Sequence, residues 1–192
     1  MKRLPRLQCG PVELRLVTPR SAQQMYALAR DPEVSRLLQW PPHRSVDDSL
    51  EFIHEARTLW ERRTAWLPGI FDLERGKLVG ATGIHGIDEA NRRGEVGTWL
   101  GVPHQRRGFN LPAKAAVVTF GFQELQLARL EFLVRVDNER SLRAMRQLPA
   151  IREEGVLAQR IWRDGAGHDA VLFALLADEF EPSAWPDVHI DR

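Results

Sequence analysis

Apolar positions recur along the chain with two different periods, and each period predicts a different kind of element. Every second residue is apolar in residues 12–18, which predicts a strand. Further strands are predicted where apolar or alternating segments lie between turn signals, at residues 65–73, 77–87, 95–102, 130–136, 156–162 and 168–176. Turns at residues 74–76 and 164–167 join two pairs of these segments as hairpins.

Helical spacing of apolar residues marks four other segments, at residues 21–30, about 46–62, 111–127 and 138–148. The second has Ser45 as its N-cap and Asp48 three residues later, a variant of the capping box. Its buried stripe is expected to contain Phe52, Ile53, Ala56, Leu59 and Trp60.

The order of these elements predicts a mixed α/β fold of the α+β type. We expect a central mixed, mostly antiparallel twisted sheet of about seven strands with helices on both faces. Residues 95–136 read strand, helix, strand, which predicts a right-handed parallel crossover. Ligands of such units bind where the strand ends and the helix begins.

The length of 192 residues favours one domain, expected over residues 1–192 with a core at about 12–180 and a peripheral tail at 181–192. A hydrophobic fraction of 43% and a charged fraction of 28% are ordinary for a soluble globular protein. The net charge of +1 argues against a large nucleic-acid-binding surface.

Cys9 is the sole cysteine, which excludes an intrachain disulfide and a Cys-rich zinc site, so no metal is expected. We expect Cys9 to be a small, half-buried structural residue. The first sixteen residues lack the apolar run of a signal peptide, and no segment approaches the ~20 apolar residues of a membrane span. The expected location is the cytoplasm, with no membrane partner.

The segment between the predicted strand and helix of the crossover carries the most informative chemistry, in Gln105, Arg106, Arg107, Gly108, Phe109 and Asn110. A helix amino terminus exposes unpaired N–H groups and a partial positive charge, and both favour a bound phosphate. Gly108 permits close approach and positive φ, and the two arginines add charge. A charged, solvated turn is the alternative that the loop alone leaves open.

The surroundings of this loop resemble the GNAT superfamily, whose pyrophosphate loop reads Gln/Arg-x-x-Gly-x-Gly/Ala. Gln105, Gly108 and Asn110 occupy these places, with Asn where Gly or Ala is usual. The chain is most similar to the branch of ribosomal-protein-alanine N-acetyltransferases. In that branch a strand ending in Trp-Leu, a segment like Asn-Glu-Arg-Ser-x-Arg-Ala and a late Glu-Gly-Val-Leu occur in order. They match residues 95–100, 138–144 and 154–157.

The resemblance implies an acetyl-coenzyme A-dependent N-acetyltransferase that acetylates a primary amine, with acetyl-coenzyme A as cofactor. The backbone of Leu100, Gly101 and Val102 would pair with the pantetheine arm, and residues 105–110 would hold the pyrophosphate. Asn138 would hydrogen-bond the arm from the other wall. Gly97 suits a bulge that separates two parallel strands, or it is a packing glycine.

Two prolines depart from the family pattern. Leu148-Pro149-Ala150 stands where Leu-Gly and a third residue are frequent, so the preceding helix must end differently. Pro112 lies in the first turn of the helix after the loop, where it is sterically tolerated but removes one N–H donor.

Amide formation from a thioester requires a neutral amine and a protonated leaving thiolate. Glu95 is the candidate base, and a surface ion pair with Arg92 or Arg93 is its alternative. Many family members use a tyrosine as the acid, but Tyr26, the sole tyrosine, lies in the first helix. The resemblance to the family makes Ser141, one turn into the short helix after Asn138, the better candidate for the acid, with helix capping as its alternative.

Candidate acceptor-binding residues are Trp40, in the loop between the first two helices, and His85, on a central strand. Trp66 is a further aromatic residue that could line the same cleft. A lone histidine on a strand is more often structural.

The leading functional hypothesis is transfer of the acetyl group to a peptide amino terminus or a small-molecule amine by direct attack on the thioester. A non-catalytic acyl-coenzyme A sensor or scaffold with the same fold is the alternative. Nucleic acid is not an expected partner, because the charge is near zero and no aromatic recognition motif is present. Members of the family are often dimers, so a homodimer is possible.

Overall fold

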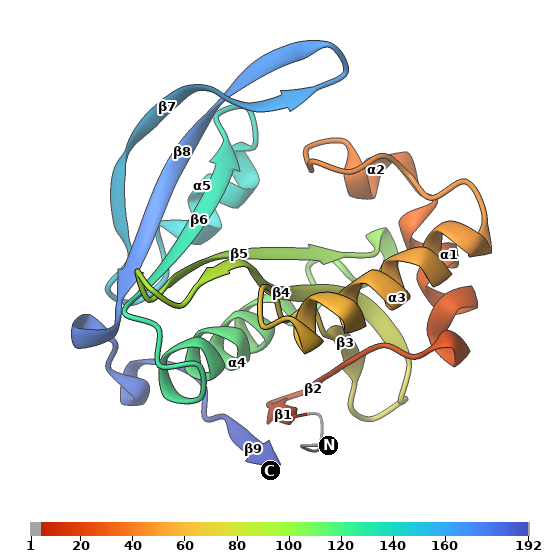
Figure 1. The fold of residues 1–192 in the computed structure, drawn as a ribbon, viewed down its shortest axis with the longest axis horizontal. Coiled ribbons are helices and arrows are strands. Elements are labelled where there is room, and N and C mark those ends of the chain that lie inside the picture. Colours follow the sequence, from red (N-terminus) through yellow and green to blue (C-terminus); the bar gives the residue numbers. More distant parts are fainter. Residues whose placement is uncertain (1–4, 192) are drawn as a thin grey trace.

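The computed structural model describes residues 5–191, and its strands form one sheet in the order β7-β8-β6-β5-β4-β3-β2-β1-β9 (Figure 1). All neighbours are antiparallel except β5 and β6, which are parallel. This confirms the predicted mixed, mostly antiparallel sheet. The strands are β1 (Arg6–Cys9), β2 (Val12–Arg15), β3 (Gly69–Asp72), β4 (Leu78–Asp88), β5 (Arg93–Leu100), β6 (Arg129–Arg135), β7 (Arg152–Arg163), β8 (Ala166–Leu176) and β9 (His189–Asp191).

The described residues form nine strands, not about seven, because both chain ends add to the sheet edge. β1 pairs with β2, and β9 pairs with β1 near the chain ends. The expectation of a peripheral tail is therefore wrong for this segment, and Trp185 is buried in the main core. Cys9 is fully buried rather than half-buried, and burial raises the pKa of its thiol to about 11.

The helices are α1 (Ala22–Ala29), α2 (Pro32–Ser35), α3 (Val46–Glu61), α4 (Asn110–Gln123) and α5 (Glu139–Met145). The four predicted helices are confirmed, and α2 is an additional short turn that Asp31 caps. The capping box is also confirmed, because Ser45 Oγ accepts from Asp48 N–H and the Asp48 carboxylate accepts from Ser45 N–H. After α5, Pro149 is followed by Ala150 in the left-handed region at φ 56°.

Helices cover both faces of the sheet, as consecutive residues of β3 show. Phe71 belongs to a cluster with Met25 of α1 and Ile53 of α3, whereas Ile70 belongs to the main core with residues of α4. The helix α4 is buried at every position from Ala113 to Phe122. Phe180 and Trp185 are packed beside it, since Phe122 lies 5.2 Å from Phe180 between ring centroids.

The crossover from β5 through α4 to β6 is parallel as predicted, but its two strands pair at only three positions. Beyond the pair Glu95–Glu131 the strands part, and in Figure 1 β6 runs upward while β5 runs to the right. Among residues 5–191, no helix has the length and apolarity to cross a membrane.

Candidate active site

A cleft of about 540 Å³ lies where β5 and β6 part. Its walls come from both strands, from residues 37–40, from α5 and from β7. The cleft contains five of the residues predicted for the catalytic or binding site, namely Trp40, His85, Glu95, Asn138 and Ser141. Tertiary structure therefore brings together side chains that lie up to 101 positions apart in the sequence.

The edge of β5 that faces the cleft has backbone groups without a partner strand. The Gly101 amide donates to Val79 O at 2.9 Å, so Leu100 and Gly80 form a non-hydrogen-bonded pair. The N–H and C=O groups of Thr98, two positions earlier, likewise point away from β4 and toward the opening, whereas the Val96 N–H takes part in the last bridge to β6, at Glu131. The free edge thus includes Leu100 of the predicted residues and extends N-terminally to Thr98. The Gly101 amide is used inside the sheet, and Val102 begins a 3-10 turn.

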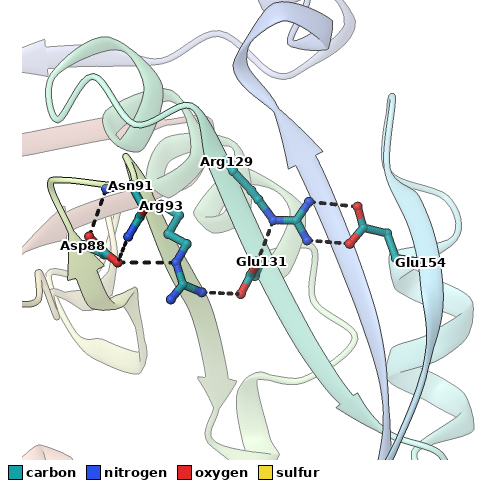
Figure 2. A network of polar contacts seen from close by, with 6 residues as sticks. All are labelled: Asp88, Asn91, Arg93, Arg129, Glu131 and Glu154. Carbon is teal, nitrogen blue, oxygen red and sulfur yellow. Dashed lines mark hydrogen bonds and ion pairs between the residues drawn. The ribbon is translucent and has the colours of Figure 1, made fainter.

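Six residues fix the point at which the strands separate, and Figure 2 shows them as a chain of polar contacts: Asp88, Asn91, Arg93, Arg129, Glu131 and Glu154. Glu131 is the centre, because it accepts from Arg129 Nε at 2.7 Å and lies 3.8 Å from Arg93 Nη1. Arg129 also binds Glu154 of β7, while Arg93 reaches Asp88 of β4. These contacts therefore link β4, β5, β6 and β7, and they span β8, which lies between β6 and β7 in the sheet.

Glu95 lies beside this network without joining it. Arg93 pairs with Asp88 and Glu131, and Arg92 Nε donates to Gln126 O, so neither neighbour forms the ion pair considered from the sequence. Burial is the main cause that raises the pKa of the Glu95 carboxyl. Like charge on Glu131 adds to this effect and Arg160 opposes it. A carboxylate with a raised pKa and no fixed partner can accept a proton.

His85 faces Glu95 across the β4–β5 pair, and Gly97 leaves room for its ring. A Cβ atom at Gly97 would lie 3.1 Å from His85 Nε2. Gly97 pairs regularly with Gly83, so the bulge expected there is absent and the packing alternative holds. Although the His85 side chain still meets solvent, the cleft walls displace enough water to lower its pKa. Its neutral form is therefore favoured.

Trp40 forms the far wall of the cleft. Its ring lies 5.4 Å from that of Trp99, and Arg163 of the β7–β8 hairpin donates to the carbonyl oxygens of Leu38 and Trp40 at 2.8 and 2.6 Å. Trp66 does not line the cleft as expected. It is fully buried and stacks on Phe120 at 3.9 Å, because its position bridges to Ile84 on the side covered by α4.

Asn138 and Ser141 occupy the wall formed by the start of α5. Asn138 Oδ1 accepts from the Ser141 amide at 3.1 Å and so caps the helix. Neither the Asn138 NH₂ group nor the Ser141 hydroxyl has a hydrogen-bond partner among residues 5–191, and both residues line the cleft. The capping role belongs to Asn138, which leaves the hydroxyl of Ser141 available. Tyr26 instead donates to Arg44 O and is not among the lining residues.

The loop of residues 105–110 lies between the end of β5 and the start of α4. The Gln105 side chain holds it in place, donating to Leu100 O at 3.1 Å and accepting from Arg140 at 2.7 Å. Arg106 and Gly108 both have positive φ, at 60° and 81°. Between residues 106 and 111, no backbone amide donates to an acceptor within the described part of the chain.

A row of free amides in this alternating backbone is the arrangement that binds anions at helix starts. The exposed side chains of Arg106 and Arg107 add positive charge, and Phe109 is buried and anchors the turn. The residues present therefore fit a diphosphate. Pro112 lies within the first turn of α4 without interrupting the helix, as predicted.

The cleft residues that were not predicted from the sequence include Lys114 and Arg160. Lys114 is buried in α4, and its signal was a lysine inside the apolar run Ala113–Val118. Arg160 follows a bulge in β7 at which the register shifts and Gln159 takes φ 47°. Bulges redirect side chains, but no local sequence pattern marked this one.

Comparison with known proteins agrees with this geometry. A family model described as an acetyltransferase (GNAT) domain matches residues 12–149. YdaF of Bacillus subtilis (strain 168) is 30% identical over 173 residues, which cover 88% of this chain and 93% of YdaF. The ribosomal-protein-serine acetyltransferase of Escherichia coli (strain K12) is 27% identical over 170 residues, covering 87% of this chain and 93% of that protein.

A solved structure shares the fold at lower identity. The microcin C7 self-immunity acetyltransferase MccE, in complex with acetyl-coenzyme A and AMP, superposes with a TM-score of 0.78. It is 21% identical, and the match covers 87% of this chain and 93% of that one.

Proposed function

The chain belongs to the GNAT family of acetyltransferases and is an acetyl-coenzyme A-dependent N-acetyltransferase, and from this premise we propose that it acetylates a primary amine by direct attack on the thioester. The acceptor is a peptide amino terminus or a small-molecule amine. The observation that carries the proposal is Glu95, an unpaired carboxylate with a raised pKa in the cleft between the diverging strands.

Each end of the acyl donor has matching groups on this chain. The amides of residues 106–111 and the side chains of Arg106 and Arg107 would hold the pyrophosphate. The free edge of β5 at Thr98 and Leu100 would bind the pantetheine arm as an added strand does. The Asn138 NH₂ group would contact the arm from α5. With these contacts the thioester would lie in the cleft beside Glu95.

The reaction forms one N–C bond and breaks one C–S bond. Glu95, directly or through a water molecule, accepts the proton that the amine loses and later releases it to solvent. The Ser141 hydroxyl donates a proton to the departing sulfur as it takes one from solvent water. A well-placed base contributes ~10²–10⁴-fold. Holding the amine and the thioester together can contribute ~7–11 kcal/mol. Trp40 and His85 would form the wall against which the acceptor lies.

A thiol-release assay with acetyl-coenzyme A and a panel of peptides and small amines tests this function. We expect release that depends on the amine and falls by at least ~10²-fold in Glu95→Gln. Glu55→Gln is the matched control, because Glu55 is exposed on α3 outside the cleft. Tight binding of coenzyme A without amine-dependent release from any acceptor would contradict the proposal.

A further inference from the structure

Lys114 is a buried cation that the reaction described above does not use. Its side chain is 8% exposed and lines the cleft from the second turn of α4. No carboxylate or other acceptor among residues 5–191 pairs with its ammonium group. Buried lysines are rare unless they are paired, because removing an ammonium from water costs several kcal/mol.

The other charged groups of the cleft do not compensate for this burial. On β5 and β6, Arg93 and Glu131 pair with each other and Arg135 pairs with Asp137. The remaining titratable or charged lining groups without such a pair are His85 on β4, Glu95 on β5 and Arg160 on β7. Desolvation alone lowers the pKa of Lys114 to about 8, with no attraction from a carboxylate to oppose it.

Lys114 and Glu95 approach the cleft from opposite faces of the sheet. Val96, the residue after Glu95, packs in the main core with Ile84 and α4. Because side chains alternate along a strand, Glu95 and His85 point to the other face. Lys114 comes from α4 on the core side, and both Lys114 and Glu95 line the cleft.

We propose that the Lys114 ammonium stabilises the negative charge that develops on the acetyl thioester during transfer. This role rests on the proposed function. An amine entering from the Glu95 face pushes the carbonyl oxygen and the sulfur of the thioester toward the opposite face as its N–C bond forms. The electron pair of the breaking C–S bond then resides on sulfur, which receives a proton from Ser141. A fixed cation on that face stabilises both atoms, and a site of low dielectric strengthens the effect.

Lys114→Met separates this role from a structural one. We expect kcat to fall by about 10²-fold, in the range found when one stabilising donor is removed. The affinity of Lys114→Met for coenzyme A should stay within a few-fold of the wild-type value. Lys114→Arg keeps a positive charge and should therefore retain part of the wild-type kcat. Lys77→Met, at an exposed turn, is the control and should change neither value.

Thermal stability supplies a second readout. Because the folded pKa of Lys114 lies below its ordinary 10.5, the folded state is penalised at pH values below about 8. The penalty disappears as the pH rises from 8 to 10.5. Lys114→Met should therefore raise Tm at neutral pH, and the gain should shrink across that window.

Turnover and binding outcomes distinguish the two proposals. If wild-type enzyme acetylates amines and Lys114→Met retains full kcat, or loses coenzyme A affinity instead, the role of Lys114 is wrong and the function stands. If no amine is acetylated, the function fails. Ultraviolet titration of the thiol of bound coenzyme A, which needs no turnover, should give a lower thiol pKa in wild type than in Lys114→Met, and equal values would overturn the role.

Discussion

Glu95 of β5 lies opposite Glu131 of β6 in the last register pair that joins the two parallel strands. Arg93 and Arg129 neutralise Glu131, whereas the Glu95 side chain forms no ion pair or hydrogen bond with any of residues 5–191. Two carboxylates in adjacent positions therefore have different properties. Glu131 holds the strands at the point where they separate (Figure 2), and Glu95 lines the cleft.

This relationship predicts the pH dependence of the reaction. Glu95 must be ionised to accept a proton, so the acidic limb of kcat/KM should lie above its ordinary 4.5. Glu131→Gln removes a like charge, so the limb should move to lower pH. The limb should stay above pH 4.5, because burial is the larger cause of the raised pKa and remains in the variant.

Glu154→Gln is the control from the same network (Figure 2) and should leave the limb in place. An unshifted limb in Glu131→Gln would show that another group titrates.

Asn138 has two expected roles that two substitutions separate. Asp caps a helix about as well as Asn, so Asn138→Asp should retain the stability of α5 but lose the NH₂ donor. We expect a higher Kd for coenzyme A with little change in Tm. Asn138→Ala should lose both the helix cap and the NH₂ donor. The loss of the cap should cost about 1 kcal/mol of stability. Calorimetric titration and thermal unfolding measure the two effects, and unchanged affinity in Asn138→Asp would limit the residue to capping.

The left-handed backbone at Gly108 predicts a loss of cofactor binding without loss of fold. A β-branched residue at φ 81° is strained, although a Cβ atom there would meet no neighbour. Gly108→Val should therefore distort the free amides and weaken coenzyme A binding by about 10-fold or more, on the scale of 1–3 kcal/mol for such strain. Gly165→Val, at φ 78° in the β7–β8 turn, carries comparable strain away from the loop. It should lower Tm similarly and leave the affinity intact; equal losses of affinity would refute the placement of the pyrophosphate.

Arg163 connects the β7–β8 hairpin to the loop that carries Trp40. Because its guanidinium donates to two backbone carbonyls, Arg163→Ala should release that loop. We expect faster hydrogen exchange in residues 36–45 and an acceptor KM raised by about 10-fold, with coenzyme A affinity unchanged. Asp164→Asn removes only an exposed partner of Arg163 and is the control. Identical exchange in Arg163→Ala and wild type would contradict this.

Local signals in the sequence identified most elements and the cofactor loop. The capping box at Ser45 and the positive φ of Gly108 depend on neighbouring residues, so they could be predicted without knowledge of the fold. Short elements were harder to predict from the sequence. β1 and β9 have four and three residues, and their pairing depends on a partner more than 170 positions away. Trp66 was misplaced because burial depends on which face of the sheet α4 covers.

The amino-acid sequence alone determined the order of the elements, the helix caps and the chemistry of the loop before α4, because hydrogen bonds and backbone preferences over a few residues decide them. The tertiary structure decided which side of the sheet each group reaches and where β5 and β6 part. It left Glu95 without the arginine partner that its neighbours in sequence offered, and it placed Lys114 on the opposite side of the same opening. Such relationships come from the packing of distant segments, which displaces water and sets the charge on each group.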